Sequence, residues 1–170
     1  ALEYGNDLPE VHLQIGYYYF LALRDKKNRD LHWAIAAKGM PDNVDMIRAK
    51  YESMTTEGRW KEAQRMLEAG VKKNPNVSDL YSNLGLVDWF LRDYKRSDEA
   101  FDMALSLNPQ GEFPWVGKAF NMWAWKGVNH ESQEFCSNAK NQHWYHYLEF
   151  WNVAGSGRYQ EALQLVNDTI

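Results

Sequence analysis

The sequence contains little of what would define several classes of function. Its only cysteine, Cys136, excludes an internal disulfide and any zinc site built from four cysteines. Basic residues are not in excess, and a formal net charge of -4 gives no support to nucleic-acid binding through a broad basic face. No uninterrupted apolar stretch reaches the roughly 18–20 residues needed to cross a bilayer, so we expect no membrane insertion of this segment. One cysteine fits either the cytosol or an exported location, which leaves the compartment open with the cytoplasm favoured.

The common catalytic motifs are also missing. The sequence has no phosphate-binding loop, no dinucleotide fingerprint and no nucleophile elbow. Two groups of side chains could still support chemistry: His143 with His146, and His130 with Glu134 near Cys136. Neither group forms a recognised metal or nucleophile arrangement, so surface or interhelical side chains are the simpler interpretation. We predict a non-catalytic chain without cofactor or metal, and a cryptic site around these histidines is the alternative.

Aromatic residues, in contrast, are abundant and follow a repeat. They make up 15% of the chain, which requires a large core or a repeated packing unit. Pro41, Pro75 and Pro109 are each 34 residues apart. Three other series keep the same step: Arg29, Ala63 and Ser97; Trp33, Leu67 and Phe101; Ala36, Gly70 and Ala104. Within each unit these positions are four and three apart, which is helical spacing, and proline ends the unit.

The pattern predicts one repeat domain over residues 1–170, with pairs of helices in successive units. The units are approximately 9–41, 42–75, 76–109, 110–141 and 142–170. The expected helices are 9–24, 29–38, 44–56, 60–73, 77–90, 94–107, 113–125, 131–140, 143–154 and one from 159 onward. Gly58 is expected to take a positive φ in its turn. One residue beyond the period is assigned to a turn at 25–28, where Lys26 to Arg29 would form a solvated basic cluster. Both end units look incomplete, which predicts a fragment of a longer chain.

These features resemble the tetratricopeptide repeat. The 34-residue period and the Asn-Pro endings at 74–75 and 108–109 match that family, and its opening signature is best kept at 81–85 and 12–19. The first three units match well and the last two weakly. The style of the first unit is similar to repeat regions of bacterial signalling and transcription-regulatory proteins. The resemblance implies an all-α, right-handed superhelical solenoid of about four to five helix-turn-helix units.

The same resemblance implies a binding surface. In that family the first helix of each unit lines a concave groove. The family register, carried onto this sequence, gives these groove residues: Leu13, Tyr17, Phe20, Arg48, Glu52, Leu86, Trp89, Phe90, Phe120, Trp123 and Trp151. Most are apolar or aromatic, and large apolar surfaces are rarely left without a partner. We therefore expect a protein–protein interaction scaffold that binds a peptide or partner domain, with Arg48 able to anchor a carboxylate.

Other interpretations stay open. Neighbouring repeats, or an additional helix, could cover the same rings. The array could be a structural or regulatory spacer that packs on an attached signalling or transcription-regulatory domain. It could also form a homo-oligomer through its open repeat ends. The carboxylate-binding mode of some tetratricopeptide co-chaperones is not matched, because Asp79 at one of the corresponding positions would repel that ligand.

Overall fold

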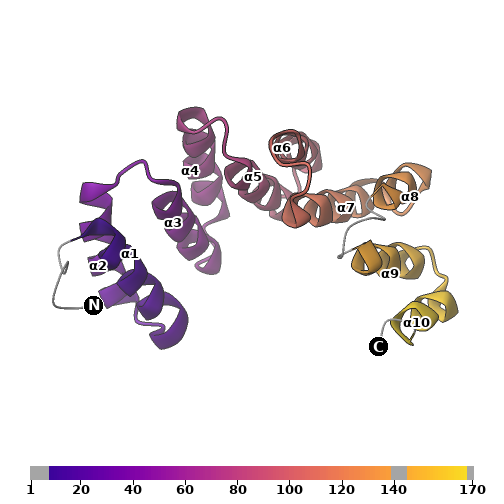
Figure 1. Ribbon diagram of the computed structural model, residues 1–170, viewed down its shortest axis with the longest axis horizontal. Helices are drawn as coiled ribbons and strands as arrows, with labels where there is room; N and C mark the ends of the chain where they lie inside the picture. Colours follow the sequence, from indigo (N-terminus) through magenta and orange to yellow (C-terminus); the bar gives the residue numbers. More distant parts are fainter. Residues whose placement is uncertain (1–7, 139–144, 168–170) are drawn as a thin grey trace. The chain divides into compact units, whose positions relative to one another are not determined.

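The structure is a computed structural model that describes residues 8–138 and 145–167. Every regular element in these ranges is helical, as the sequence predicts (Figure 1). The elements are α1 (Pro9–Tyr18), the π-helical η1 (Tyr19–Leu23), α2 (Lys26–Gly39), α3 (Val44–Thr56), α4 (Trp60–Lys73), α5 (Ser78–Phe90), α6 (Tyr94–Leu107), α7 (Glu112–Lys126), α8 (His130–Ser137), α9 (Tyr145–Gly155) and α10 (Tyr159–Asn167). Among the described helices, none combines the length and the apolar character needed to cross a membrane.

The chain divides into two compact units, Ala1–Leu80 and Tyr81–Ile170. In unit 1, α1 packs on α2 and α3 on α4, and α3 contacts both helices of the first pair. In unit 2, α7 packs against α6 and α8, and α9 packs against α8 and α10. Each unit is therefore built from helices that pack against their neighbours in the chain.

The residues of the 34-residue period form the cores of these pairs, which confirms their predicted role. The bulky and small members are all buried: Trp33, Leu67, Phe101, Ala36, Gly70 and Ala104. Burial of one large apolar side chain contributes on the order of 1.5–3 kcal/mol, and the small members let the paired helices approach closely.

Unit 1 is packed around the indole of Trp33. A methyl group added at Gly16 would overlap this ring, so the first helix can approach it only with glycine at that position. The Trp33 Nε1 donates a hydrogen bond to the Leu13 carbonyl oxygen at 3.2 Å. The rings of Tyr17 and Phe20 each lie 5.6 Å from the indole, centroid to centroid. Trp33 thus joins α1 and η1 to α2.

Unit 2 uses Phe101 at the corresponding position. A methyl group at Gly85 would come within 3.0 Å of this ring, and one at Gly117 would overlap it. Phe101 therefore fills the space beside glycines of both α5 and α7. The Ser97 Oγ donates to the Gly85 carbonyl oxygen at 2.8 Å and also ties α6 to α5.

The prediction of a turn at 25–28 is wrong. Helix α2 begins at Lys26, because the Asp25 carboxylate accepts a hydrogen bond from the Asn28 amide at 3.1 Å and caps the helix. The residue in excess of the period lies instead in η1, where wider π-helical winding accommodates it. Arg24 then ends this segment in the left-handed region, with φ of 54°.

Most other boundaries agree with the sequence. The helices predicted at 44–56, 60–73 and 94–107 are confirmed, and Gly58 has the expected positive φ, 74°. The helix predicted at 131–140 is α8, whose last helical residue is Ser137. Residues 139–144 lie outside the described part of the chain, including the predicted start of the next helix.

Candidate functional site

A groove of about 630 Å³ lies in unit 1 between α1–η1 and α3. Its lining residues are Gln14, Tyr17, Phe20, Leu21, Asp45, Arg48, Glu52, Thr55 and Thr56. The members from α3 recur at helical spacing, which places them on one face of that helix. Four residues predicted for the binding surface therefore meet here: Tyr17, Phe20, Arg48 and Glu52. We call this feature the unit 1 groove.

The α1–η1 wall of the unit 1 groove is mainly apolar. Phe20 lines it although only 8% of the residue is exposed, whereas Leu21 is 58% exposed. Leu13, which the family register placed in the groove, is 3% exposed and belongs to the Trp33 core. Leu13 and Phe20 belong to the same core cluster, but only Phe20 also reaches the edge of the groove. Gln14 lies on the groove face instead, and the register omitted it.

The α3 wall is charged. Arg48 forms ion pairs with Asp45 at 3.4 Å and with Asp79, in the first turn of α5, at 3.6 Å. Burial raises the pKa of the half-buried Glu52, while Arg48 and a hydrogen bond with Tyr17 lower it to a smaller extent. Burial, and next the charge of Glu52, hold the pKa of the Tyr17 hydroxyl far above its ordinary value of 10. Tyr17 is therefore a neutral phenol that faces an acidic surface.

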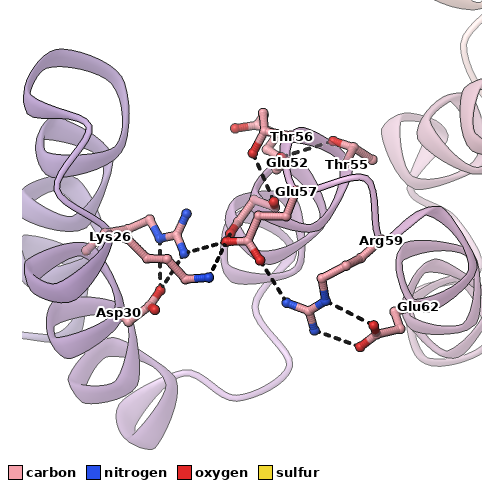
Figure 2. A network of polar contacts seen from close by, with 10 residues as sticks. Lys26, Asp30, Glu52, Thr55, Thr56, Glu57, Arg59 and Glu62 are labelled. Carbon is pink, nitrogen blue, oxygen red and sulfur yellow. Dashed lines mark hydrogen bonds and ion pairs between the residues drawn. The ribbon is translucent and has the colours of Figure 1, made fainter.

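A network of ion pairs surrounds Glu57 near the end of α3 (Figure 2). Its carboxylate lies 3.0 Å from the Arg29 guanidinium and 3.1 Å from both Lys26 and Arg59. Hydrogen bonds from Arg29, then Lys26 and Arg59, lower the pKa of Glu57 to about 2. The network joins the start of α2 to the turn between α3 and α4.

Arg29 connects this network to the unit 1 groove. It is 5% exposed, so the predicted solvated basic cluster is wrong at this position. Its guanidinium carbon lies 5.6 Å from the centre of the Phe20 ring and 5.4 Å from that of Trp33. The corresponding residues of the other units are Ala63 and Ser97. The arginine at this position is surrounded by two aromatic rings and pairs with the carboxylates of Glu57 and Asp30.

Unit 2 brings together three other predicted residues, Phe120, Trp123 and Trp151. The Phe120 ring lies 5.1 Å from Trp123, 6.2 Å from Tyr147 and 6.1 Å from Trp151. We call these four residues the aromatic cluster. Tyr147 and Trp151 are exposed. A cavity of about 340 Å³ adjoins the cluster at Tyr147, and Phe113 also lines it.

The remaining predicted surface residues lie on α5. Trp89 and Phe90 contact each other edge-to-face, with ring centres 5.0 Å apart. Phe90 is exposed, whereas Leu86 and Trp89 are partly buried. Within the described part of the chain, the buried Nε1 of Trp89 has no hydrogen-bond partner.

The side chains considered for chemistry do not form a reactive centre in the described residues. Burial raises the pKa of Cys136 to about 11, so its thiol stays protonated at neutral pH. His130 lies 3.9 Å from Glu134, both being exposed, and His146 contacts a carboxylate of its own helix. His143 lies outside the described residues. Across residues 8–138 and 145–167, no three metal-binding side chains come together.

One pair of histidines was not found from the sequence. The Nδ1 atoms of His12 and His32 are 2.8 Å apart, and their rings stack with centres 5.0 Å apart. Burial, and next the proximity of His12, lower the pKa of His32. The pair joins α1 to α2 on the side of Tyr19, whose ring stacks on His32. A separation of 20 residues across two helices gives no local sequence signal.

Comparison with known proteins supports the fold. No model of a known protein family matches the sequence. No curated protein matches it either. Among solved structures, PilF of Pseudomonas aeruginosa has a TM-score of 0.73 at 16% identity, covering 96% of this chain and 76% of that chain. MamA (41-end) from Desulfovibrio magneticus RS-1 has a TM-score of 0.65 at 19% identity, covering 82% and 77%. Yeast Tom70 has a TM-score of 0.77 at 14% identity, covering 98% and 37%.

These similarities show the fold of the chain. Its architecture is an all-α helical repeat. More particularly, the neighbours are tetratricopeptide-repeat proteins, so the fold is of the tetratricopeptide type that the sequence resembled.

Proposed function

We propose that this chain is a non-catalytic protein-interaction scaffold that binds a peptide segment of its partner in the unit 1 groove. The observation that carries the proposal is the convergence of Tyr17, Arg48 and Glu52 on a groove of about 630 Å³. Helical-repeat proteins use extended surfaces for binding, and a volume of this order is typical of ligand sites.

The shape of the groove favours a peptide over a compact ligand. Its α3 wall extends from Asp45 to Thr56, which corresponds to roughly 16 Å at the rise of an α-helix. About five residues of an extended chain span that length. The exposed Leu21 on the opposite wall offers an apolar contact, and the hydroxyl groups of Thr55 and Thr56 offer polar ones.

Selection from a library of short random peptides on the immobilised protein tests the proposal. Leu21→Asn removes an apolar contact from an exposed part of the groove wall without adding a charge, and should weaken capture about tenfold. Leu31→Asn is the matched control, because Leu31 is an exposed leucine of α2 that does not line the groove. Equal capture by the two variants, both shown to be helical by circular dichroism, would reject the unit 1 groove as the binding site.

The aromatic cluster is a second contact surface in this proposal. Exposed aromatic residues are frequent anchors in protein interfaces. Trp151 belongs to the cluster and Trp125 does not, yet each is 42% exposed. Trp151→Ala should therefore reduce partner binding more than Trp125→Ala, and equal losses would show that the cluster has no specific role.

Self-association is a second candidate function, and the exposed apolar side chains of α10 favour it. Tyr159, Leu163 and Val166 are four and three residues apart on this helix, and all three are exposed. Such an apolar stripe suits packing against a helix of another copy or of an attached signalling or transcription-regulatory domain. Sedimentation should then show a concentration-dependent dimer that Leu163→Asp abolishes. A monomer at all concentrations would rule out the homo-oligomer.

A further inference from the structure

The unit 1 groove carries more negative than positive charge. Asp45 and Glu52 lie on its α3 wall on either side of Arg48 in the sequence. Arg48 also forms an ion pair with Asp79, at 3.6 Å. When all four groups are ionised, three carboxylates face one guanidinium, which leaves two negative charges in excess. Arg48 is already engaged with Asp45 and Asp79, so it is a poor anchor for an incoming carboxylate.

Glu52 is the carboxylate with most to gain from a ligand cation. It is half-buried between Tyr17 and Arg48, and burial raises its pKa despite the opposing effect of Arg48. The internal guanidinium therefore does not replace the hydration that Glu52 has lost. A ligand cation that reached this carboxylate would stabilise its charged form and donate a charge-assisted hydrogen bond to it.

The apolar wall is also suited to a cationic side chain. The faces of aromatic rings attract ammonium and guanidinium groups, and Tyr17 lines the groove. Phe20 already interacts in this way with Arg29 inside the protein, at 5.6 Å. The exposed Leu21 can contact the aliphatic part of a lysine or arginine.

The basic residues beyond the Thr56 end of the groove do not cancel this excess. Lys26 and Arg29 are paired with Glu57 at 3.1 and 3.0 Å, and Arg29 also pairs with an aspartate of α2. Arg24 lines a smaller adjoining cavity of about 220 Å³. An acidic peptide directed to Arg24 is therefore the rival ligand that an experiment must test.

We infer that the unit 1 groove binds a basic segment of a protein partner, with a lysine or arginine against Asp45 and Glu52 and an apolar neighbour on Leu21. This inference rests on the proposed function and specifies the charge of the ligand.

The test uses three libraries of short random peptides that differ only at one central residue, which is arginine, glutamine or glutamate. The arginine library should give the strongest capture on the unaltered chain. Replacing that arginine by uncharged citrulline in a captured peptide should weaken binding about tenfold, as measured by fluorescence anisotropy at low salt. The difference should shrink at high salt, since the groove is open to solvent.

Three variants locate the effect. Glu52→Gln should remove the preference for arginine, whereas Glu99→Gln, which removes the same charge from an exposed position on α6, should keep it. Arg48→Gln should leave capture of the arginine library unchanged or improve it, and a loss would contradict the inference.

The outcomes separate the inference from the proposed function. Equal capture of the three libraries, still weakened by Leu21→Asn, would reject the basic ligand and keep the peptide groove. Preferential capture of the glutamate library would also reject the basic ligand. No capture from any library would reject both proposals.

Discussion

Units 1 and 2 place different aromatic rings at the same position of the repeat. In unit 1, a methyl group added at Gly16 would overlap the indole of Trp33. In unit 2, a methyl group added at Gly85 would lie 3.0 Å from the ring of Phe101. The larger indole also contacts Tyr17, which lines the unit 1 groove. The period therefore sets where a ring packs, and in unit 1 that ring also contacts a residue of the groove.

A second difference concerns the small position of the repeat. Ser97 in unit 2 forms one neutral hydrogen bond to a carbonyl oxygen, but Arg29 in unit 1 is a buried cation that needs Glu57. Because the Glu57 carboxylate that pairs with Arg29 can be protonated, we expect the stability of unit 1 to depend on pH. Arg29 also places a guanidinium beneath Phe20.

The largest effect should come from the two glycines. Gly16→Ala should destabilise unit 1 by about 2–3 kcal/mol, because its methyl group overlaps the buried indole of Trp33 and neither can move away freely. Gly85→Ala should change the stability of unit 2 by less than about 1 kcal/mol, because the higher helix propensity of alanine offsets the tighter contact. Urea unfolding followed by circular dichroism measures both values. Equal losses would show that the two rings are packed alike.

The Glu57 network should give a smaller effect that depends on pH. Glu57→Gln should cost about 1–3 kcal/mol at neutral pH, since it removes one of the two carboxylates, Glu57 and Asp30, that pair with the buried Arg29. The pKa of Glu57 is lowered from its usual 4.5 to about 2, so its contribution is complete above pH 4.5 and is lost as the pH falls through about 2. The unaltered chain and the variant should therefore converge in stability near pH 2.

Ser97→Ala provides the matched control in unit 2. It removes a buried neutral hydrogen bond and should cost about 1 kcal/mol. Because no titrating group takes part in that bond, the loss should be the same at neutral pH and in acid. A pH-dependent loss for Ser97→Ala, or a constant one for Glu57→Gln, would contradict the assignment of the charge effect to unit 1.

The smallest effects concern the two turns that occupy the same position of the repeat. Gly58 and Arg92 have φ of 74° and 61°, in the left-handed region where only glycine is free of steric cost. Gly58→Ala should destabilise the chain by about 1 kcal/mol. Arg92→Gly should stabilise it by up to about 0.5 kcal/mol, because relief of strain is partly offset by the greater freedom of unfolded glycine. Thermal unfolding measures both, and a loss for Arg92→Gly would show that its side chain has a role in the turn.

The period of the sequence was sufficient to predict the fold, since the positions of Trp33, Leu67 and Phe101 define which faces of the helices meet. It was insufficient for the start of α2. Asp25 is a common capping residue and signals a helix that starts at Lys26. The period alone, however, does not show where the residue in excess of it lies. A π-helical turn such as η1 has no comparable signal, because its winding depends on how α1 packs against α2.

The candidate site was predicted in part for a related reason. Helical spacing alone placed Arg48 and Glu52 on one face of α3. It did not separate Leu13 from Tyr17, because α1 has apolar residues on its core face and on its groove face. The partners of Arg48 were also beyond the sequence, since Asp79 lies on another helix and only their distance in space shows that they pair.

The central claim is that the unit 1 groove is the place where this chain holds a peptide. Amide chemical shifts of the labelled chain, recorded during titration with a peptide captured from the arginine library, test it most directly. We predict that the largest changes fall on α1, η1 and α3, at Tyr17, Glu52 and their neighbours. Changes confined to α7 and α9, around the aromatic cluster, would contradict the claim.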